Sequence, residues 1–234
     1  MTKNRTVRTG MFALITALAV GVLAACSPAS GKSGNGGTDA TEALWSAVDS
    51  GDADAARQAI DDGADLESRR PIDATPVIAA TKNNDARVAR VLIDAGADVN
   101  AKDGLQDSAF LYAGAEGLDE ILEMTIDAGA DVKSTNRYGG TALIPASEHG
   151  HVSTIRILIA AGVPVDHVNN LGWTAMHEAI ILNDGGPDQV KAVRLLLEAG
   201  ADPGITENGG LTARELAEQK GYDEIVAVID AAEA

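Results

Sequence analysis

The sequence predicts an all-α solenoid of about six helix-turn-helix units joined by short β-hairpin-like loops. Gly-Ala-Asp or a close variant recurs at intervals of 33, 33, 33 and 38 residues, at Gly63, Gly96, Gly129, Gly162 and Gly200. A series of Thr or Ser keeps the same intervals, at Thr75, Ser108, Thr141, Thr174 and Thr212. Between these marks, apolar residues lie three and four apart, as on one face of a helix. Two series with one period and one shared shift of five residues indicate stacked repeats.

The chain begins with a segment typical of a secretory signal peptide, residues 1–25. Lys3, Arg5 and Arg8 precede an apolar run over residues 11–25. At roughly 1.5 Å per residue this run reaches only about 22 Å, short of a ~30 Å hydrocarbon core. We therefore expect a signal peptide and not a transmembrane anchor.

The signal ends in Leu-Ala-Ala-Cys at residues 23–26, which resembles the lipobox of bacterial lipoproteins. The resemblance implies that Cys26 is lipidated with diacylglycerol and becomes the new N-terminus after cleavage. The protein would then be anchored to the cell membrane on its extracytoplasmic side, at the cell surface or in the periplasm. The alternatives are an incidental cysteine in an ordinary signal and a free redox thiol. Because Cys26 is the only cysteine, an intramolecular disulfide is impossible.

Residues 26–40 are rich in Gly and Ser, without an apolar pattern, and predict a flexible tether. The folded domain is expected over residues 41–234, beginning near Thr41. Residues 26–234 contain 15 basic and 35 acidic residues, a net charge near −20. Such an acidic body repels phosphate backbones, so we expect no nucleic-acid binding.

The repeats resemble the ankyrin family over roughly residues 41–234, in units near 41–68, 69–101, 102–134, 135–167, 168–205 and 206–234. Residues 75–80 read Thr-Pro-Val-Ile-Ala-Ala and residues 174–179 read Thr-Ala-Met-His-Glu-Ala, which match the start of the family's first helix. We expect Thr75 and Thr174 to cap these helices with their hydroxyls. Second helices follow near residues 88–93, 121–126, 155–159 and 193–197, each ending at a recurring glycine that suits a left-handed C-cap.

Departures from the repeat are informative. The first unit lacks a hairpin and predicts an N-terminal cap with Trp45 in the core, while the last unit has polar residues where a further repeat would pack. In unit five the extra residues fall between the helices, around residues 183–188. Pro145 lies inside a first helix, where it removes one hydrogen bond and is expected to kink the helix.

No constellation of residues predicts catalysis, and we expect no cofactor. His149 and His151 could be called a metal pair, but repeat consensus explains both, so we expect no metal site. Residues 184–188 lack the ligand spacing of an EF-hand, which favours a solvated turn. The alternatives that stay open are a small-ligand or metal-binding lipoprotein and, less favoured, a hydrolase that uses the unit-five insertion.

In the ankyrin family, hairpin tips and the exposed side of the first helices form a concave surface that usually binds protein partners. The resemblance implies partner-binding residues at these positions: Asp107, Tyr112, Arg137, Tyr138, Glu148, Trp173 and Glu178. Tyr, Trp and Arg are enriched at interface hot spots. The competing interpretation is that Tyr138 and Trp173 only pack between hairpins. We expect a monomer that binds an unidentified, basic protein partner and is not an enzyme.

Overall fold

The computed structural model describes residues 36–234 and confirms the predicted all-α solenoid. The signal peptide, Cys26 and most of the predicted tether lie outside the described residues. Six helix pairs follow one another along the described part of the chain: α1 (Gly36–Ser50) with α2 (Ala53–Asp61), α3 (Pro76–Lys82) with α4 (Ala86–Asp94), α5 (Ala109–Glu116) with α6 (Asp119–Asp127), α7 (Leu143–Glu148) with α8 (Val152–Ala160), α9 (Ala175–Ile181) with α10 (Pro187–Glu198), and α11 (Ala213–Lys220) with α12 (Asp223–Ala232). A short 3-10 turn, η1, spans Pro71–Asp73. Within residues 36–234 no helix has both the length and the apolar character needed to span a membrane.

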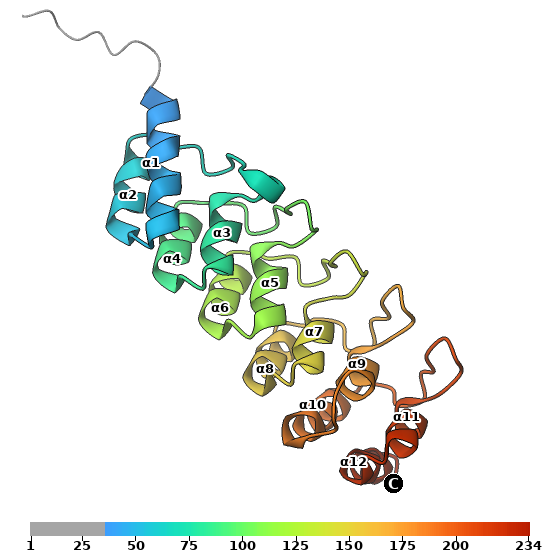
Figure 1. Ribbon diagram of the computed structural model, residues 1–234. Coiled ribbons are helices and arrows are strands. Elements are labelled where there is room, and N and C mark those ends of the chain that lie inside the picture. The colour runs from blue at the N-terminus through green and yellow to red at the C-terminus, as the bar shows by residue number, and fades with distance from the viewer. Residues whose placement is uncertain (1–35) are drawn as a thin grey trace, which may run out of the picture. The chain divides into compact units, whose positions relative to one another are not determined.

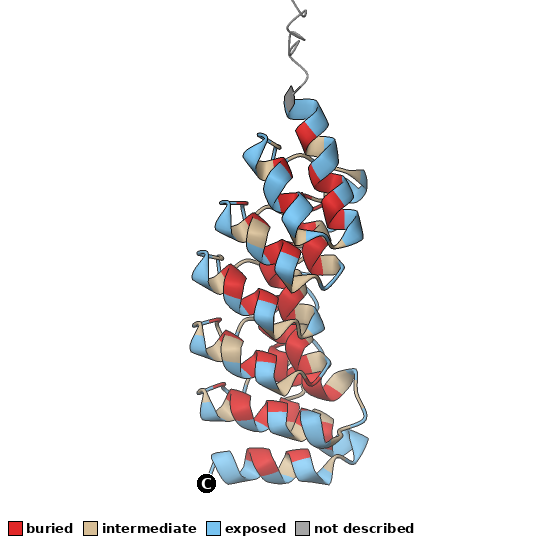
Figure 2. Ribbon diagram, turned by 90° about the vertical axis from the view of Figure 1, so that its left-hand side faces the viewer, coloured by how far each residue is buried: buried red, intermediate tan, exposed pale blue. Residues whose placement is uncertain are grey.

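The helices form two layers with the hairpin loops projecting on one side (Figure 1). Odd-numbered helices stack on one another to form the inner layer beside the loops, and even-numbered helices form the outer layer. One apolar core runs between the layers through the whole stack (Figure 2). Its largest fully buried side chains come from both layers, and include Leu44, Ile78, Phe110, Leu158 and Ile225.

The folded part begins earlier than the sequence predicts. Helix α1 starts at Gly36, so residues 36–40 are helical and do not belong to a tether. Two contacts explain the difference. Ala40 is buried, and the Thr41 hydroxyl donates to the Gly37 carbonyl while accepting from the Asp65 N–H. Trp45 lies in the core as predicted, with 3% of its surface exposed and its indole N–H donating to Ser68.

The recurring glycines end the outer helices in the predicted left-handed conformation. Their φ angles lie between 83° and 92°, at Gly63, Gly96, Gly129, Gly162 and Gly200. Because an L side chain disfavours this region of φ, glycine suits the position after the helix.

The threonine caps are only half confirmed. The Thr174 hydroxyl accepts from the His177 N–H, and His177 Nδ1 accepts in turn from the Thr174 N–H, which forms a reciprocal cap. Thr75 has the same extended backbone, but its buried hydroxyl has no hydrogen-bond partner, so the predicted cap at Thr75 is wrong. Thr141 shares this unpaired state.

Pro145 acts at the start of α7. In α3, α5, α9 and α11 the fourth residue after the cap position donates its N–H to the carbonyl of that position, as Tyr112 does to Ser108 and Glu178 does to Thr174. Pro145 has no N–H, so the predicted loss of one hydrogen bond is confirmed. The Ile144 N–H bonds the Thr141 carbonyl instead, at 3.2 Å, and α7 begins only at Leu143.

The insertion in unit five lies between α9 and α10, as predicted, and it extends both the loop and the helix. The loop covers residues 182–186, and α10 has 12 residues where α8 has nine. Tyr222 donates its hydroxyl to the Asn183 carbonyl, so the last repeat holds the inserted loop in place.

Candidate functional site

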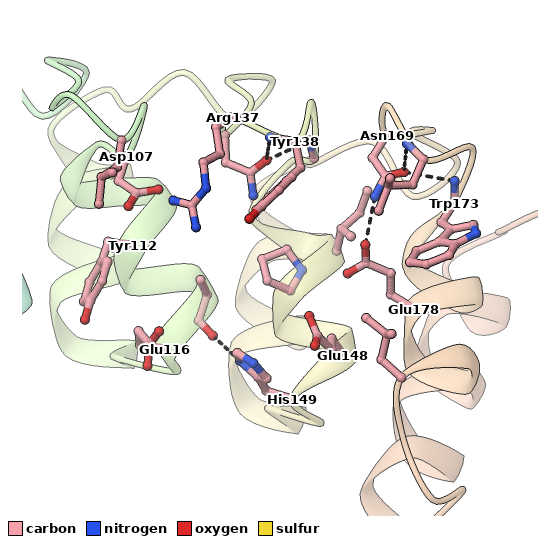
Figure 3. Close-up of a pocket in the computed structure, with 18 of the residues that line it drawn as sticks. Asp107, Tyr112, Glu116, Arg137, Tyr138, Glu148, His149, Asn169, Trp173 and Glu178 are labelled. Atoms are coloured by element: carbon pink, nitrogen blue, oxygen red, sulfur yellow. Dashed lines mark hydrogen bonds between the residues drawn. The ribbon is translucent and has the colours of Figure 1, made fainter.

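A concave hollow of about 500 Å³ lies where α5, α7 and α9 meet their hairpins. We call it the central hollow. Its wall includes all seven residues that the sequence predicts for partner binding (Figure 3): Asp107, Tyr112, Arg137, Tyr138, Glu148, Trp173 and Glu178. Asp107 and Glu178 are far apart in the chain, yet they line the same surface. Stacked repeats bring them together because each repeat presents equivalent positions to the same side.

Each hairpin holds its residues through the same local hydrogen bonds. The Asn136 side-chain oxygen accepts from the N–H groups of Tyr138 and Gly140, and the Asn169 oxygen accepts from those of Leu171 and Trp173. Asp103 does the same in the preceding hairpin. Asn and Asp suit this role because their short side chains bond backbone N–H groups two residues on. Tyr138 and Trp173 are thus carried on ordered turns.

At one end of the central hollow, Lys82 is held between two carboxylates. Its ammonium lies 2.5 Å from Asp103 and 3.6 Å from Asp107, and 5.2 Å from the centre of the Tyr112 ring. Burial acts to raise the pKa of Asp103, but the hydrogen bond from Lys82 and two backbone N–H groups lower it overall. Burial raises the pKa of Asp107. Lys82 and Asp103 are not among the residues predicted from the sequence, although Asp103 shares its register with Asn136 and Asn169.

In the middle, Arg137 and Tyr138 form a cation–π pair. The guanidinium carbon lies 4.7 Å from the ring centre. Tyr138 is 51% exposed, Arg137 of its own hairpin lies against its ring, and its backbone carbonyl accepts from the Asn170 N–H of the next hairpin. Within residues 36–234, Arg137 makes no ion pair with an acid. Trp173 is half-buried at the opposite wall. Both rings are therefore partly accessible from the hollow.

The floor contains two carboxyl groups from neighbouring helices. Glu178 is only 7% exposed, and its Oε1 accepts a 2.8 Å hydrogen bond from the Asn169 amide. Burial, followed by the nearby charge of Glu148, raises the pKa of Glu178 to about 7. This is the one strongly perturbed acid of the hollow, and the sequence did not indicate that it is buried.

Exposed apolar residues form a row along the hairpin tips. Ile72, Leu105, Tyr138 and Leu171 occupy the same position in successive hairpins, and each is at least 41% exposed. The residues predicted for partner binding include Tyr138 of this row but neither Leu105 nor Leu171. The spacing of 33 residues could have identified Leu105 and Leu171, because they share the register of Tyr138.

The histidines have structural roles. His149 Nδ1 bonds the Ala115 carbonyl at 2.8 Å, and His177 is buried in the cap of α9, where burial lowers its pKa. In the described part of the chain, no group of three or more His, Cys, Asp or Glu is arranged to hold a metal ion. In the inserted loop, the Asp184 side chain accepts from the Gly186 N–H, as in an ordinary turn.

Comparison with known proteins identifies the repeats. A family profile for three copies of the ankyrin repeat matches residues 110–207, and the single-repeat profile matches residues 73–104. The chain is 51% identical over 55 residues to YahD of Escherichia coli (strain K12), whose name describes an ankyrin repeat protein; the match spans 24% of this chain and 27% of YahD.

Solved structures show the same repeat architecture. A crystal structure of an ankyrin repeat domain from Acinetobacter baumannii AYE matches with a TM-score of 0.79 and 50% identity, over 82% of this chain and 97% of that domain. A second ankyrin repeat protein matches with a TM-score of 0.78 and 38% identity, over 81% of this chain and 97% of the other. The ankyrin repeat domain of Bcl-3, at 22% identity and a TM-score of 0.71, is similar in fold.

Proposed function

This chain belongs to the ankyrin-repeat family, and from that premise we propose that it is a protein-binding module displayed on the outer side of a cell membrane. Ankyrin repeats generally bind protein partners. The observation that carries the proposal is the central hollow, where Tyr138, Leu171 and Trp173 are accessible on ordered turns. Partly exposed aromatic residues on a rigid concave surface are typical of interaction hot spots.

Membrane attachment in this proposal depends on Cys26. The basic residues and apolar run of residues 1–25, followed by Leu-Ala-Ala-Cys, support export and lipidation. Replacement of Cys26 by Ser is expected to abolish incorporation of a labelled fatty acid and to leave the signal uncleaved. Cleavage without lipid in the wild type, with release into a soluble fraction, would exclude the anchor.

The net charge of the region after the signal favours one class of protein partner. The region after the signal carries a net charge near −20, which attracts basic surfaces and accelerates encounter with them. A basic protein is therefore favoured over an acidic one, and over nucleic acid.

Site-specific photocrosslinking tests the proposal. A photoreactive amino acid at Leu171, on the hairpin row, is compared with one at Arg156, which is exposed on the outer helix α8. We expect a discrete crosslinked partner from Leu171 only, and its loss when Tyr138 and Trp173 are both changed to Ala. Equal products from both positions, or a product that survives the double change, would contradict the proposal.

A small ligand is the second candidate, because the hollow of about 500 Å³ matches the volume of small-molecule sites. This function would give no protein crosslink at Leu171, and a low-molecular-weight compound would copurify with the wild type but not with the double Ala variant. Elemental analysis of the same samples tests for a metal. A hydrolase that uses the inserted loop is disfavoured, because contacts with Tyr222 and within the turn occupy its polar groups.

A further inference from the structure

The floor of the central hollow contains an acid at a position where the other repeats have none. Glu178 is the fourth residue after Thr174, and the equivalent residues are Ala79, Tyr112, Pro145 and Leu216. Leaving a carboxyl group 7% exposed is unfavourable unless it is neutralised or paired. The unit therefore maintains a buried acid that repeat packing does not require.

Glu148 and Glu178 form what we call the carboxyl pair. They lie on the neighbouring inner helices α7 and α9, and Figure 3 shows both side chains beside the same space below Tyr138 and Trp173. Asn169 donates one hydrogen bond to Glu178 Oε1, while Asn183 contacts the Glu148 backbone rather than its carboxylate.

Within residues 36–234, no cation lies at ion-pair distance from either carboxylate. The basic groups around the hollow have other contacts. Lys82 pairs with Asp103, Arg137 stacks on Tyr138, and His149 bonds the Ala115 carbonyl. Burial, followed by the charge of Glu148, raises the pKa of Glu178 to about 7, and no cation of the described residues pairs with the carboxylate to offset this.

The wall above the carboxyl pair suits an alkyl chain that ends in a cation. Trp173 presents an aromatic ring to the hollow, Tyr138 adds a second ring against which Arg137 is stacked, and Pro145 and Leu182 add apolar surface for the stem. A lysine side chain combines a flexible apolar stem with a compact ammonium that donates three hydrogen bonds. An acidic or purely apolar side chain satisfies only one part of this arrangement.

We propose that the central hollow receives a lysine side chain of the protein partner, with its ammonium between the carboxylates of Glu148 and Glu178 and its stem beside Tyr138 and Trp173. The inference rests on the proposed function and deepens it by naming the group that the partner inserts. In this arrangement Tyr138 and Trp173 form the walls of the site, and the carboxyl pair makes the site selective for a positive charge.

A peptide titration tests this assignment directly. The probe is an acetylated and amidated Leu-Lys-Leu peptide, and the control is the same peptide with its lysine ε-amine acetylated. Binding to the full chain is followed by NMR at the indole N–H of Trp173, with the indole of Trp45, buried near the N-terminal end of the stack, as internal reference. We expect the charged peptide to move the Trp173 signal alone and to bind at least about tenfold more tightly than the neutral peptide.

Two double variants with the same change in net charge separate the site from general attraction. Glu148→Gln with Glu178→Gln removes the pair, whereas Glu123→Gln with Glu198→Gln removes two exposed acids of the outer helices α6 and α10. We expect the first to weaken the charged peptide about tenfold or more and the second to leave it nearly unchanged. Equal weakening by both variants, or equal binding of the charged and neutral peptides, would overturn the lysine site.

The crosslink at Leu171 distinguishes failure of the lysine site from failure of the proposed binding function. A partner that depends on Tyr138 and Trp173, but crosslinks equally to the Glu148→Gln, Glu178→Gln variant, would overturn the lysine site and leave the binding function intact. No site-dependent partner at all would overturn the binding function.

Discussion

Replacing Glu178 by Gln is expected to stabilise the protein in a pH-dependent way. Gln keeps an oxygen that accepts from Asn169 and removes the charge. The folded pKa of Glu178 is about 7 against an ordinary value of 4.5. Because the folded state holds the proton more tightly, the wild type loses stability as pH rises from 4.5 to about 7, and the loss is complete above that range.

The magnitude follows from the size of this shift. At about 1.4 kcal/mol per pKa unit, the wild type should be about 3 kcal/mol less stable than Glu178→Gln at pH 8. At pH 5.5 the difference should shrink to about 1.5 kcal/mol, because this pH lies only about one unit above the ordinary pKa and less than half of the full loss has accumulated. The sequence pI is near 4.4, so pH values from 5.5 upward keep the protein away from its isoelectric point.

Urea unfolding at pH 5.5 and pH 8 measures both differences, with Glu123→Gln as the matched control on an exposed surface. The control should track the wild type at both pH values. A stability difference for Glu178→Gln that is the same at both pH values, or a variant less stable than the wild type at pH 8, would refute the burial argument.

Three further predictions, which use five substitutions, concern how the repeats are held. Thr75→Val should stabilise the protein by about 1 kcal/mol because it removes a buried unpaired hydroxyl. Thr174→Val should destabilise it by about 1 kcal/mol because the cap of α9 is lost. Urea unfolding measures both changes, and a free energy of unfolding that moves in the same direction in both variants would contradict this contrast. In Gly139→Ala the new Cβ would lie 2.5 Å from Asn170 Oδ1, so the loss of stability should exceed the roughly 1–2 kcal/mol that an L residue costs in the left-handed conformation. Gly129→Ala has open space around its new Cβ, so its loss of stability should be that conformational strain alone. Pro145→Ala restores an N–H opposite the Thr141 carbonyl and should stabilise by about 1 kcal/mol; an unchanged urea midpoint would show that the bond does not reform.

The period of 33 residues was enough to predict the repeats, the position of the insertion and the glycine caps, because these depend on spacing along the chain. The seven residues on the wall of the central hollow were implied by the resemblance to the ankyrin family, whose hairpin tips and first helices face one side, and the spacing then located those positions in this chain. Their role in binding a partner stays a prediction. The same register contains Leu105 and Leu171, so the exposed row was within reach of the sequence.

Other features depend on contacts that spacing does not specify. The burial of Glu178 arises from the approach of α7 and α9 and from the closeness of Glu148. The unpaired hydroxyl of Thr75 and the early start of α1 depend on how side chains turn within a backbone of the expected shape. Lys82 reaches Asp103 from the preceding repeat, so neither residue alone predicts the ion pair.

The affinity of the crosslinked partner for variants of the hollow tests the central claim most directly. The purified partner is titrated against the wild type, against Tyr138→Ala with Trp173→Ala, and against Arg156→Ala with Glu198→Ala on the outer helices. We expect the first pair of changes to weaken binding by about a hundredfold, because hot-spot aromatics are lost, and the outer pair to leave the dissociation constant within about twofold. Unchanged affinity of the Tyr138, Trp173 variant would contradict the claim that the central hollow binds the partner.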